Sequence, residues 1–167
     1  MMSSTGHLIP VVTIGVRPHE GETRELVLGL KYSREKRNAR DLARIVVPCI
    51  PLATHCQFVL TWAPTTVAHR LDRGMDHAEL IARHVAAMSH IHVRQLLRRV
   101  NKETQTGQGR DVRLTRPEFV SRPLRRNLHV LVIDDVVTTG ATFHAAATAL
   151  VKAGAQSVTC IAPSRTV

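Results

Sequence analysis

Short apolar runs alternate along this chain with stretches that carry apolar residues at helical spacing. Residues 8–14 predict an edge strand and residues 58–62 a second strand, because β-forming residues dominate both. Residues 130–133 (Val-Leu-Val-Ile) contain no polar side chain, which is typical of a strand buried on both faces of a parallel sheet. Residues 92–97 and 157–161 predict two further strands.

Four stretches between these strands predict helices. Residues 22–30 and 38–47 repeat Leu, Ile and Val at helical spacing. Asp76 and Glu79 have the spacing of a capping box, so a third helix should begin near Asp76. Residues 142–153 are rich in Ala and predict the fourth. Strands that alternate with helices predict an α/β domain with a central, mainly parallel sheet flanked by helices.

Composition favours a single globular domain over residues 1–167. One hydrophobic core is sufficient at this length, and 44% hydrophobic residues exclude wholesale disorder. No window approaches the ~18 apolar residues of a membrane span, and the first ten residues lack the pattern of a secretory signal. Three cysteines without a C-x-x-C pair suit reduced thiols, so we expect a cytoplasmic protein. Residues 1–19 are expected to form a peripheral N-terminal segment.

Positive charge is concentrated in one part of the chain. The net charge is +10, and nine arginines plus Lys102 lie between residues 94 and 126. This block indicates either a solvated surface or a site for a polyanion, which would be a nucleic acid or a small molecule with several phosphates. Aromatic residues make up only 3% of the chain, which counts against a platform for stacking bases. Within the block, residues 101–117 are polar and predict either a mobile lid of a functional site or a disordered segment.

The segment most specific for chemistry is residues 130–142. Its predicted strand ends in Asp134 and Asp135, at the edge where open parallel sheets bind ligands. These carboxylates suit a pair of vicinal hydroxyl groups as hydrogen-bond acceptors. A short Thr/Gly loop and a helix N-terminus follow, and together they offer hydroxyl and backbone N–H groups to a monophosphate. The expected phosphate-binding residues are Val137, Thr138, Thr139, Gly140, Ala141 and Thr142.

Hydroxyl acceptors just before a phosphate cradle indicate a ribose 5-phosphate ligand. The alternative is a structural Asp-Asp turn ahead of a capped helix, although paired acids at a buried strand end are costly without a partner. The sequence contains neither the G-x-x-x-x-G-K-[ST] loop nor the G-x-G-x-x-G turn of other nucleotide-binding folds.

Residues 130–142 resemble, at every position, the phosphoribosyl pyrophosphate (PRPP) signature of type I phosphoribosyltransferases. Residues 29–32 (Gly-Leu-Lys-Tyr), residues 73–80 (Arg-Gly-Met-Asp-His-Ala-Glu-Leu) and residues 105–107 (Gln-Thr-Gly) resemble segments of the ComF family of such proteins.

This resemblance implies the type I phosphoribosyltransferase fold, with residues 101–117 as a mobile hood over PRPP. It also implies Mg²⁺, held mainly by PRPP oxygens, with Asp134 and Asp135 as candidate protein ligands. The implied catalytic residues are Asp134, Asp135, Arg110 and Arg113. The pyrophosphate group is expected at Lys31, Ala63, Pro64, Thr65, Thr66, Arg70 and Arg73, with a cis Ala63–Pro64 peptide bond in that loop.

Two functions follow from these observations. The first, which we favour, is a Mg²⁺-dependent transfer of ribose 5-phosphate from PRPP to a nitrogen acceptor, with release of pyrophosphate. The second is a non-enzymatic, ComF-type role in DNA uptake, with PRPP as ligand and a basic surface for single-stranded DNA. The sequence leaves the acceptor and the oligomeric state open, with a homodimer as one option.

Overall fold

A computed structural model describes most of the chain: residues 1–2, 8–33, 35–51, 57–100, 117–125 and 128–166. Of the expected hood, only Pro117 belongs to these residues, and Arg110 and Arg113 lie outside them. No helix among the described residues is long and apolar enough to cross a membrane.

The main sheet has the strand order β1-β8-β6-β2-β3, with β7 beside β8, and each of these pairings is parallel. Its strands are β1 (Val11–Pro18), β2 (Gln57–Trp62), β3 (His92–Val93), β6 (Leu128–Ile133), β7 (Val136–Val137) and β8 (Ser157–Arg165). The expected α/β architecture with a mainly parallel central sheet is therefore confirmed.

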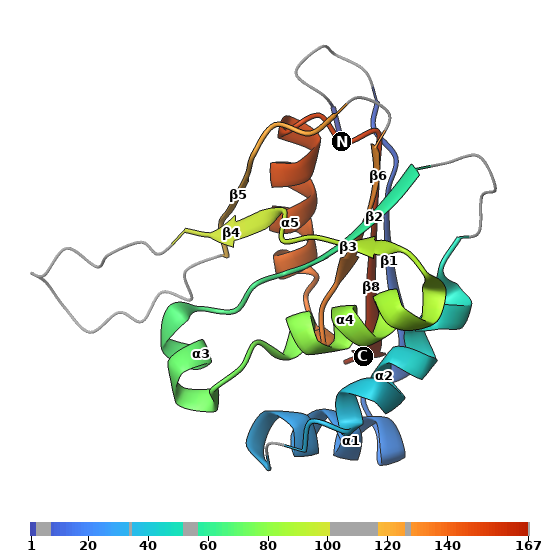
Figure 1. Cartoon of the computed structure of the whole chain (residues 1–167), viewed down its shortest axis with the longest axis vertical. Coiled ribbons are helices and arrows are strands. Elements are labelled where there is room, and N and C mark those ends of the chain that lie inside the picture. The colour runs from blue at the N-terminus through green and yellow to red at the C-terminus, as the bar shows by residue number, and fades with distance from the viewer. Residues whose placement is uncertain (3–7, 34, 52–56, 101–116, 126–127, 167) are drawn as a thin grey trace, which may run out of the picture.

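Helices cover both faces of this sheet (Figure 1). One face carries three helices: α1 (Gly21–Tyr32), α2 (Asn38–Val46) and α4 (His77–Ser89). The other carries α5 (Ala141–Lys152) and a small antiparallel pair, β4 (Leu97–Arg99) with β5 (Phe119–Ser121). The short helix α3 (Val67–Arg73) follows β2, and the 3-10 helix η1 (Val47–Cys49) extends α2.

Strand β6 lies inside the sheet because its side chains are apolar on both faces. Val130 and Val132 pack into the hydrophobic cluster with α5, whereas Leu131 and Ile133 pack into the cluster with α1, α2 and α4. All four residues are at most 1% exposed. The continuous apolar run in the sequence thus correctly predicted a strand buried on both faces.

Two expectations about strands need correction. Residues 92–97 are not one strand, because His92–Val93 pairs with β2 whereas Leu97–Arg99 pairs with β5. Between them the Arg94 N–H donates to the Leu60 carbonyl and the Leu96 N–H donates to Thr61 Oγ1, so the chain leaves the main sheet there. The expected edge strand is present as β1, but Val11–Pro18 begins three residues and ends four residues later than the apolar pattern at residues 8–14 indicated.

Candidate active site

The carboxyl ends of β2 and β6 form the edge at which the predicted acids lie. Trp62 and Ile133, the last residues of these strands, are partners in the parallel register. The chain segments after these strands diverge, since α4, which comes after β2 and α3, packs on one face of the sheet and α5 on the other. Such a divergence opens a crevice at the strand ends, which is where open α/β sheets bind their ligands.

Asp134 and Asp135 follow β6 directly and are held in different ways. The Asp134 N–H donates to the Ile161 carbonyl at 3.3 Å, and the Asp135 N–H donates to Asp134 Oδ1 at 2.8 Å. Asp135 Oδ2 lies 3.0 Å from Lys31 Nζ, which reaches the site from the last turn of α1. Lys31 was expected at the pyrophosphate, and in this structure its partner is Asp135, the second of the two acids after β6.

Burial makes Asp134 an unusual acid. It raises the pKa of Asp134 well above its ordinary value, and the charge of Asp135 acts in the same direction. The Asp135 N–H and Lys31 act against this shift. Burial and the charge of Asp134 also raise the pKa of Cys160 to about 12, so this buried thiol stays protonated. A hydroxyl donor or a cation beside Asp134 would relieve the desolvation that its carboxylate suffers.

The expected phosphate cradle begins two residues after the acids. Gly140 has φ +74°, a left-handed conformation that a side chain would disfavour, and α5 starts at the next residue. Thr139 Oγ1 accepts from the Ala141 N–H at 3.4 Å, and Thr138 and Thr139 are exposed. The loop therefore presents hydroxyls and the N-terminus of a 12-residue helix on the open edge of the sheet.

A cavity of about 270 Å³ joins these elements. It is lined by Lys31, Ala63, Pro64, Thr65, Asp76, His77, Ala78, Arg99, Asp134, Asp135 and Thr142. The structure thus brings together seven residues that the sequence assigned to a single ligand. Val137, Thr138, Thr139, Gly140 and Ala141 lie next to this cavity in the chain but do not line it.

In the loop after β2, the backbone donors expected at the pyrophosphate have partners within the protein. The Ala63 N–H donates to the Ile133 carbonyl at 3.0 Å, Pro64 has no N–H, and the Thr65 N–H donates to Asp76 Oδ2 at 2.9 Å. The described residues contain no cis peptide bond, so the expected cis Ala63–Pro64 bond is wrong. The backbone donors of residues 63–65 are thus already engaged with the sheet or with Asp76.

Four residues of the cavity were missed as site residues: Asp76, His77, Ala78 and Arg99. Asp76 was predicted only as a helix cap, and it does accept from the Glu79 N–H at 3.3 Å. Its second contact, with Thr65, depends on how α4 packs beside the end of β2. Arg99 belonged to the predicted basic block, but its guanidinium lies 5.6 Å from the centre of the Phe119 ring, on the side of β4 that faces the cavity.

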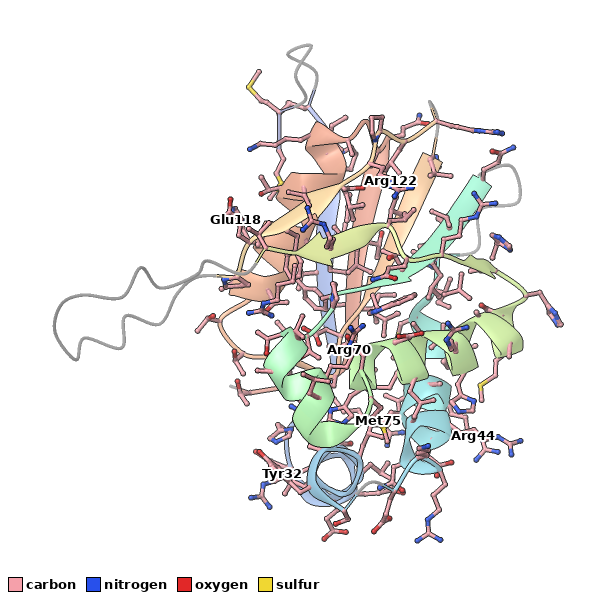
Figure 2. All side chains as sticks on the ribbon, turned by 60° about the vertical axis from the view of Figure 1, so that its left-hand side comes forward. Tyr32, Arg44, Arg70, Met75, Glu118 and Arg122 are labelled. Carbon is pink, nitrogen blue, oxygen red and sulfur yellow. The ribbon has the colours of Figure 1, made fainter. Side chains whose placement is uncertain are left out.

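Other expected basic residues are not part of the cavity. Arg70 lies on α3, exposed, and does not line it. The Arg73 side chain lies outside the described part of the structure, as do Arg110 and Arg113. Figure 2 shows Arg70 well separated from Arg122, which lies in the direction of the opposite end of the sheet.

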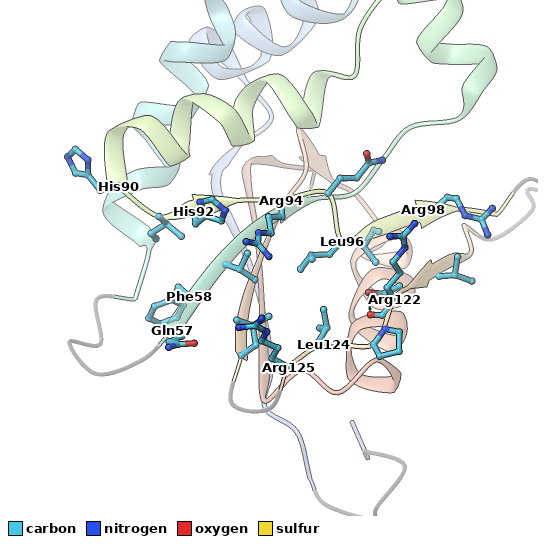
Figure 3. Close-up of a pocket in the computed structure, with 18 residues that line it drawn as sticks. Gln57, Phe58, His90, His92, Arg94, Leu96, Arg98, Arg122, Leu124 and Arg125 are labelled. Carbon is cyan, nitrogen blue, oxygen red and sulfur yellow. Dashed lines mark hydrogen bonds between the residues drawn. The ribbon is translucent and has the colours of Figure 1, made fainter.

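A larger groove of about 1470 Å³ lies at that opposite end, where β2 and β6 begin. Four arginines line it, and none has an acidic partner among the described residues: Arg94, Arg98, Arg122 and Arg125. Its floor is apolar, and Figure 3 shows Leu96 and Leu124 pointing into the space between the arginines. We call this surface the arginine groove.

Comparison with known proteins adds one finding. A family model described as phosphoribosyl transferase domain matches residues 66–165. The match runs from the loop after β2 to the end of β8, so it includes both acids and the expected phosphate cradle, but not Lys31. No curated protein matches the sequence significantly.

Proposed function

The chain belongs to the phosphoribosyl transferase family, and on that premise we propose that it transfers ribose 5-phosphate from PRPP to a nitrogen nucleophile. One observation carries this proposal. The half-buried acids Asp134 and Asp135 follow the central strand directly, and the helix N-terminus beyond Gly140 lies on the same edge of the sheet. Hydroxyl acceptors and a phosphate cradle in this order suit the two ends of a ribose 5-phosphate.

Each element then has a distinct task in binding. Asp134 and Asp135 accept hydrogen bonds from the ribose hydroxyls, which relieves the desolvation of Asp134. The backbone and hydroxyl groups of residues 137–142 hold the 5-phosphate. Lys31 and Arg99, the two cations that line the cavity, attract the pyrophosphate group.

Mg²⁺ fits this site as an ion that arrives with the ligand. Three carboxylates line the cavity against two cations, so the described residues do not neutralise a polyphosphate by themselves. No group of three or more His, Cys, Asp or Glu among the described residues is arranged to hold a metal ion. Mg²⁺ commonly binds through one or two carboxylates together with substrate phosphates, and Asp134 and Asp135 suit that role. When bound, the ion would neutralise phosphate charge.

The proposed reaction breaks the bond between ribose C1 and the pyrophosphate oxygen and forms a bond between C1 and the acceptor nitrogen. Pyrophosphate leaves with the electron pair, and the acceptor nitrogen loses a proton. Positive charge develops on the sugar as the first bond breaks, and the carboxylates of Asp134 and Asp135 stabilise it from the hydroxyl side. The chain contributes mainly positioning and charge, since no described residue stands out as a general base.

The test is turnover of Mg-PRPP against a panel of purine and pyrimidine bases, amino acids and simple amines, followed by release of pyrophosphate. Acceptor-dependent release that Asp134→Asn and Asp135→Asn abolish supports the proposal. PRPP binding by calorimetry without turnover on any acceptor would support a role of PRPP as ligand only.

The arginine groove favours a second candidate function, binding of single-stranded DNA. Its four arginines lack acidic partners in the described structure, so contacts to phosphates would carry the binding. The resemblance to the ComF family also favours single-stranded DNA as the ligand. A cytoplasmic location and a homodimer also remain part of this proposal.

Titration of a dye-labelled oligothymidylate at several salt concentrations tests this second function. We expect the logarithm of the affinity to fall with the logarithm of the salt concentration, with a slope of about −0.7 per phosphate neutralised. The quadruple variant Arg94→Ala, Arg98→Ala, Arg122→Ala and Arg125→Ala should reduce that slope. The control replaces four arginines that have carboxylate partners elsewhere: Arg17, Arg37, Arg44 and Arg83. Equal losses in the two quadruple variants would contradict a site in the groove.

A further inference from the structure

Asp76 is a buried acid of the cavity that the proposed reaction does not use. The residue is only 7% exposed. Its Oδ2 accepts from the Thr65 N–H at 2.9 Å and its Oδ1 accepts from the Glu79 N–H at 3.3 Å. One carboxylate therefore joins the loop after β2 to the first turn of α4.

Among residues 63–65, the Thr65 N–H is the backbone donor that is not committed to the sheet. The Ala63 N–H is committed to the Ile133 carbonyl inside the sheet, and Pro64 has none. Thr65 lines the cavity, and its N–H is held by a side chain rather than by the sheet. A phosphate oxygen that takes this donor must displace the Asp76 carboxylate.

Charge opposes the presence of both anions at once. Asp76 shares the cavity with Asp134 and Asp135, against Lys31 and Arg99. A pyrophosphate oxygen at Thr65 would lie close to the Asp76 carboxylate, and like charges at such separations repel strongly away from bulk water. Burial also raises the pKa of Asp76, which shows that its charge is already disfavoured where it stands.

We propose that Asp76 is a positioning residue that competes with the pyrophosphate group for the Thr65 N–H. In the ligand-free protein it holds the loop after β2 against α4. When the ligand binds, Thr65 exchanges the side-chain acceptor for a phosphate oxygen, while Glu79 keeps its cap. This inference rests on the proposed function, since it requires a pyrophosphate group in the cavity.

The effect of substitution separates competition from simple support of the fold. If Asp76 only supports the loop, its removal loosens the site and weakens binding. If Asp76 competes, its removal frees a donor, deletes a like charge and tightens binding. Asp76→Ser is the sharpest variant, because serine is a good helix N-cap but is too short to span both contacts. Asp76→Asn keeps the size of the side chain and removes the charge.

The experiment measures the affinity of Mg-pyrophosphate by calorimetry at fixed pH and salt. We expect both variants to bind about tenfold more tightly than the wild type, equivalent to ~1.4 kcal/mol. Glu79→Gln is the matched control, because it removes a charge from the same turn without touching Thr65, and its affinity should change little. On the wild-type protein, the Thr65 amide resonance should shift at saturation with pyrophosphate.

Two results would overturn the inference alone: weaker or unchanged binding in both Asp76 variants, or a Thr65 amide that stays still while the amides of Gly140 and Ala141 shift. The amide measurement uses the wild type, so it decides the matter even if Asp76→Ser does not fold. Failure of every protein to bind either PRPP or pyrophosphate would instead contradict the proposed function, and this inference with it.

Discussion

The cavity at the two acids and the arginine groove lie at opposite ends of the same strands, and their charged side chains have opposite net charge. The cavity at the carboxyl ends of β2 and β6 contains three carboxylates and two cations. The arginine groove at their amino ends contains four arginines over an apolar floor. Strand β6 spans six residues, which separates the two ends by about 17 Å. The more basic surface is therefore not the one where the fold is expected to hold a phosphorylated sugar.

A site that binds a negatively charged ligand therefore need not have a positive net charge of its own. The carboxyl-edge cavity gains specificity from acids that accept hydrogen bonds from hydroxyl groups, and it needs a cation to accept a polyphosphate. The groove offers four arginines beside apolar and neutral polar side chains, which suits a polymer bound through its phosphate backbone. Arg98 lines the groove and Arg99 lines the cavity. They are neighbours on β4, so their side chains point to opposite sides of the strand and separate the two sites.

Removal of divalent cations should give the largest difference between ligand binding at the cavity and at the arginine groove. We expect excess chelator to weaken PRPP binding by at least about 100-fold, because several charge-assisted contacts, each worth roughly 1.5–3 kcal/mol, depend on the ion. Binding of oligothymidylate to the groove should not weaken. Calorimetry for PRPP and fluorescence anisotropy for the oligonucleotide measure the two effects. PRPP binding that survives chelation would mean that cations outside the described residues balance its charge.

Substitution of the paired acids should have the next largest effect. Asp134→Asn and Asp135→Asn each remove one charged acceptor, so we expect each to weaken Mg-PRPP binding by roughly 10–100-fold. Arg94→Ala, in the groove, is the control and should leave PRPP affinity unchanged. If both acid variants bind PRPP like the wild type, the acids do not contact the ligand, and their position at the strand end is structural.

The sequence predicted the first of these regions better than the second. Residues 130–142 specify a strand, two acids, a left-handed glycine and a helix start in one contiguous run, so local chemistry was enough to find them. Local patterns also predicted the helices: α1 and α2 from apolar periodicity, α4 from its capping box and α5 from its Ala content. The contact of Asp76 with Thr65 was not predictable, because it arises from the packing of α4 beside the end of β2.

The arginines were predicted as a block in which Arg110 and Arg113 were assigned to PRPP, but Arg98 and Arg99 were not separated. Whether an arginine faces the cavity or the groove depends on the alternation of side chains along β4, which is Leu97–Arg99. The sequence pattern predicts a strand at residues 92–97 instead. A strand of three residues, paired with a partner far along the chain, leaves too short a pattern to recognise. The short helix α3 and the strands β5 and β7 were missed for the same reason.

The neighbouring arginines Arg98 and Arg99 offer a matched test of this boundary. We expect Arg99→Ala to weaken Mg-PRPP binding by about tenfold, as the loss of one charge-assisted contact would. We expect Arg98→Ala to weaken oligothymidylate binding several-fold and to reduce its salt slope by about 0.7. Both titrations are run on both variants. If each variant affects both ligands equally, the cavity and the arginine groove are not independent sites.

The smallest expected effect concerns stability without ligand, and it follows from the raised pKa of Asp134. A carboxyl whose pKa is higher in the folded than in the unfolded protein binds more protons when folded, so its contribution to stability is lost as pH rises above the ordinary value near 3.8. Asparagine imitates the protonated form and still accepts from the Asp135 N–H. Asp134→Asn should therefore be more stable than the wild type at pH 7, by about 1 kcal/mol, and the difference should shrink toward pH 4.

Urea unfolding at several pH values measures this difference, and Asp135→Asn is its control. Asp135 forms an ion pair with Lys31 at 3.0 Å, so its replacement should not stabilise the protein at pH 7. Stabilisation by Asp134→Asn together with loss of PRPP binding would show that the desolvated Asp134 carboxylate reduces the stability of the fold and is needed for ligand binding. A variant less stable than the wild type at pH 7 would show that Asp134 supports the fold, and the contrast between an acidic binding site and a basic groove would then rest on Asp76 and Asp135 alone.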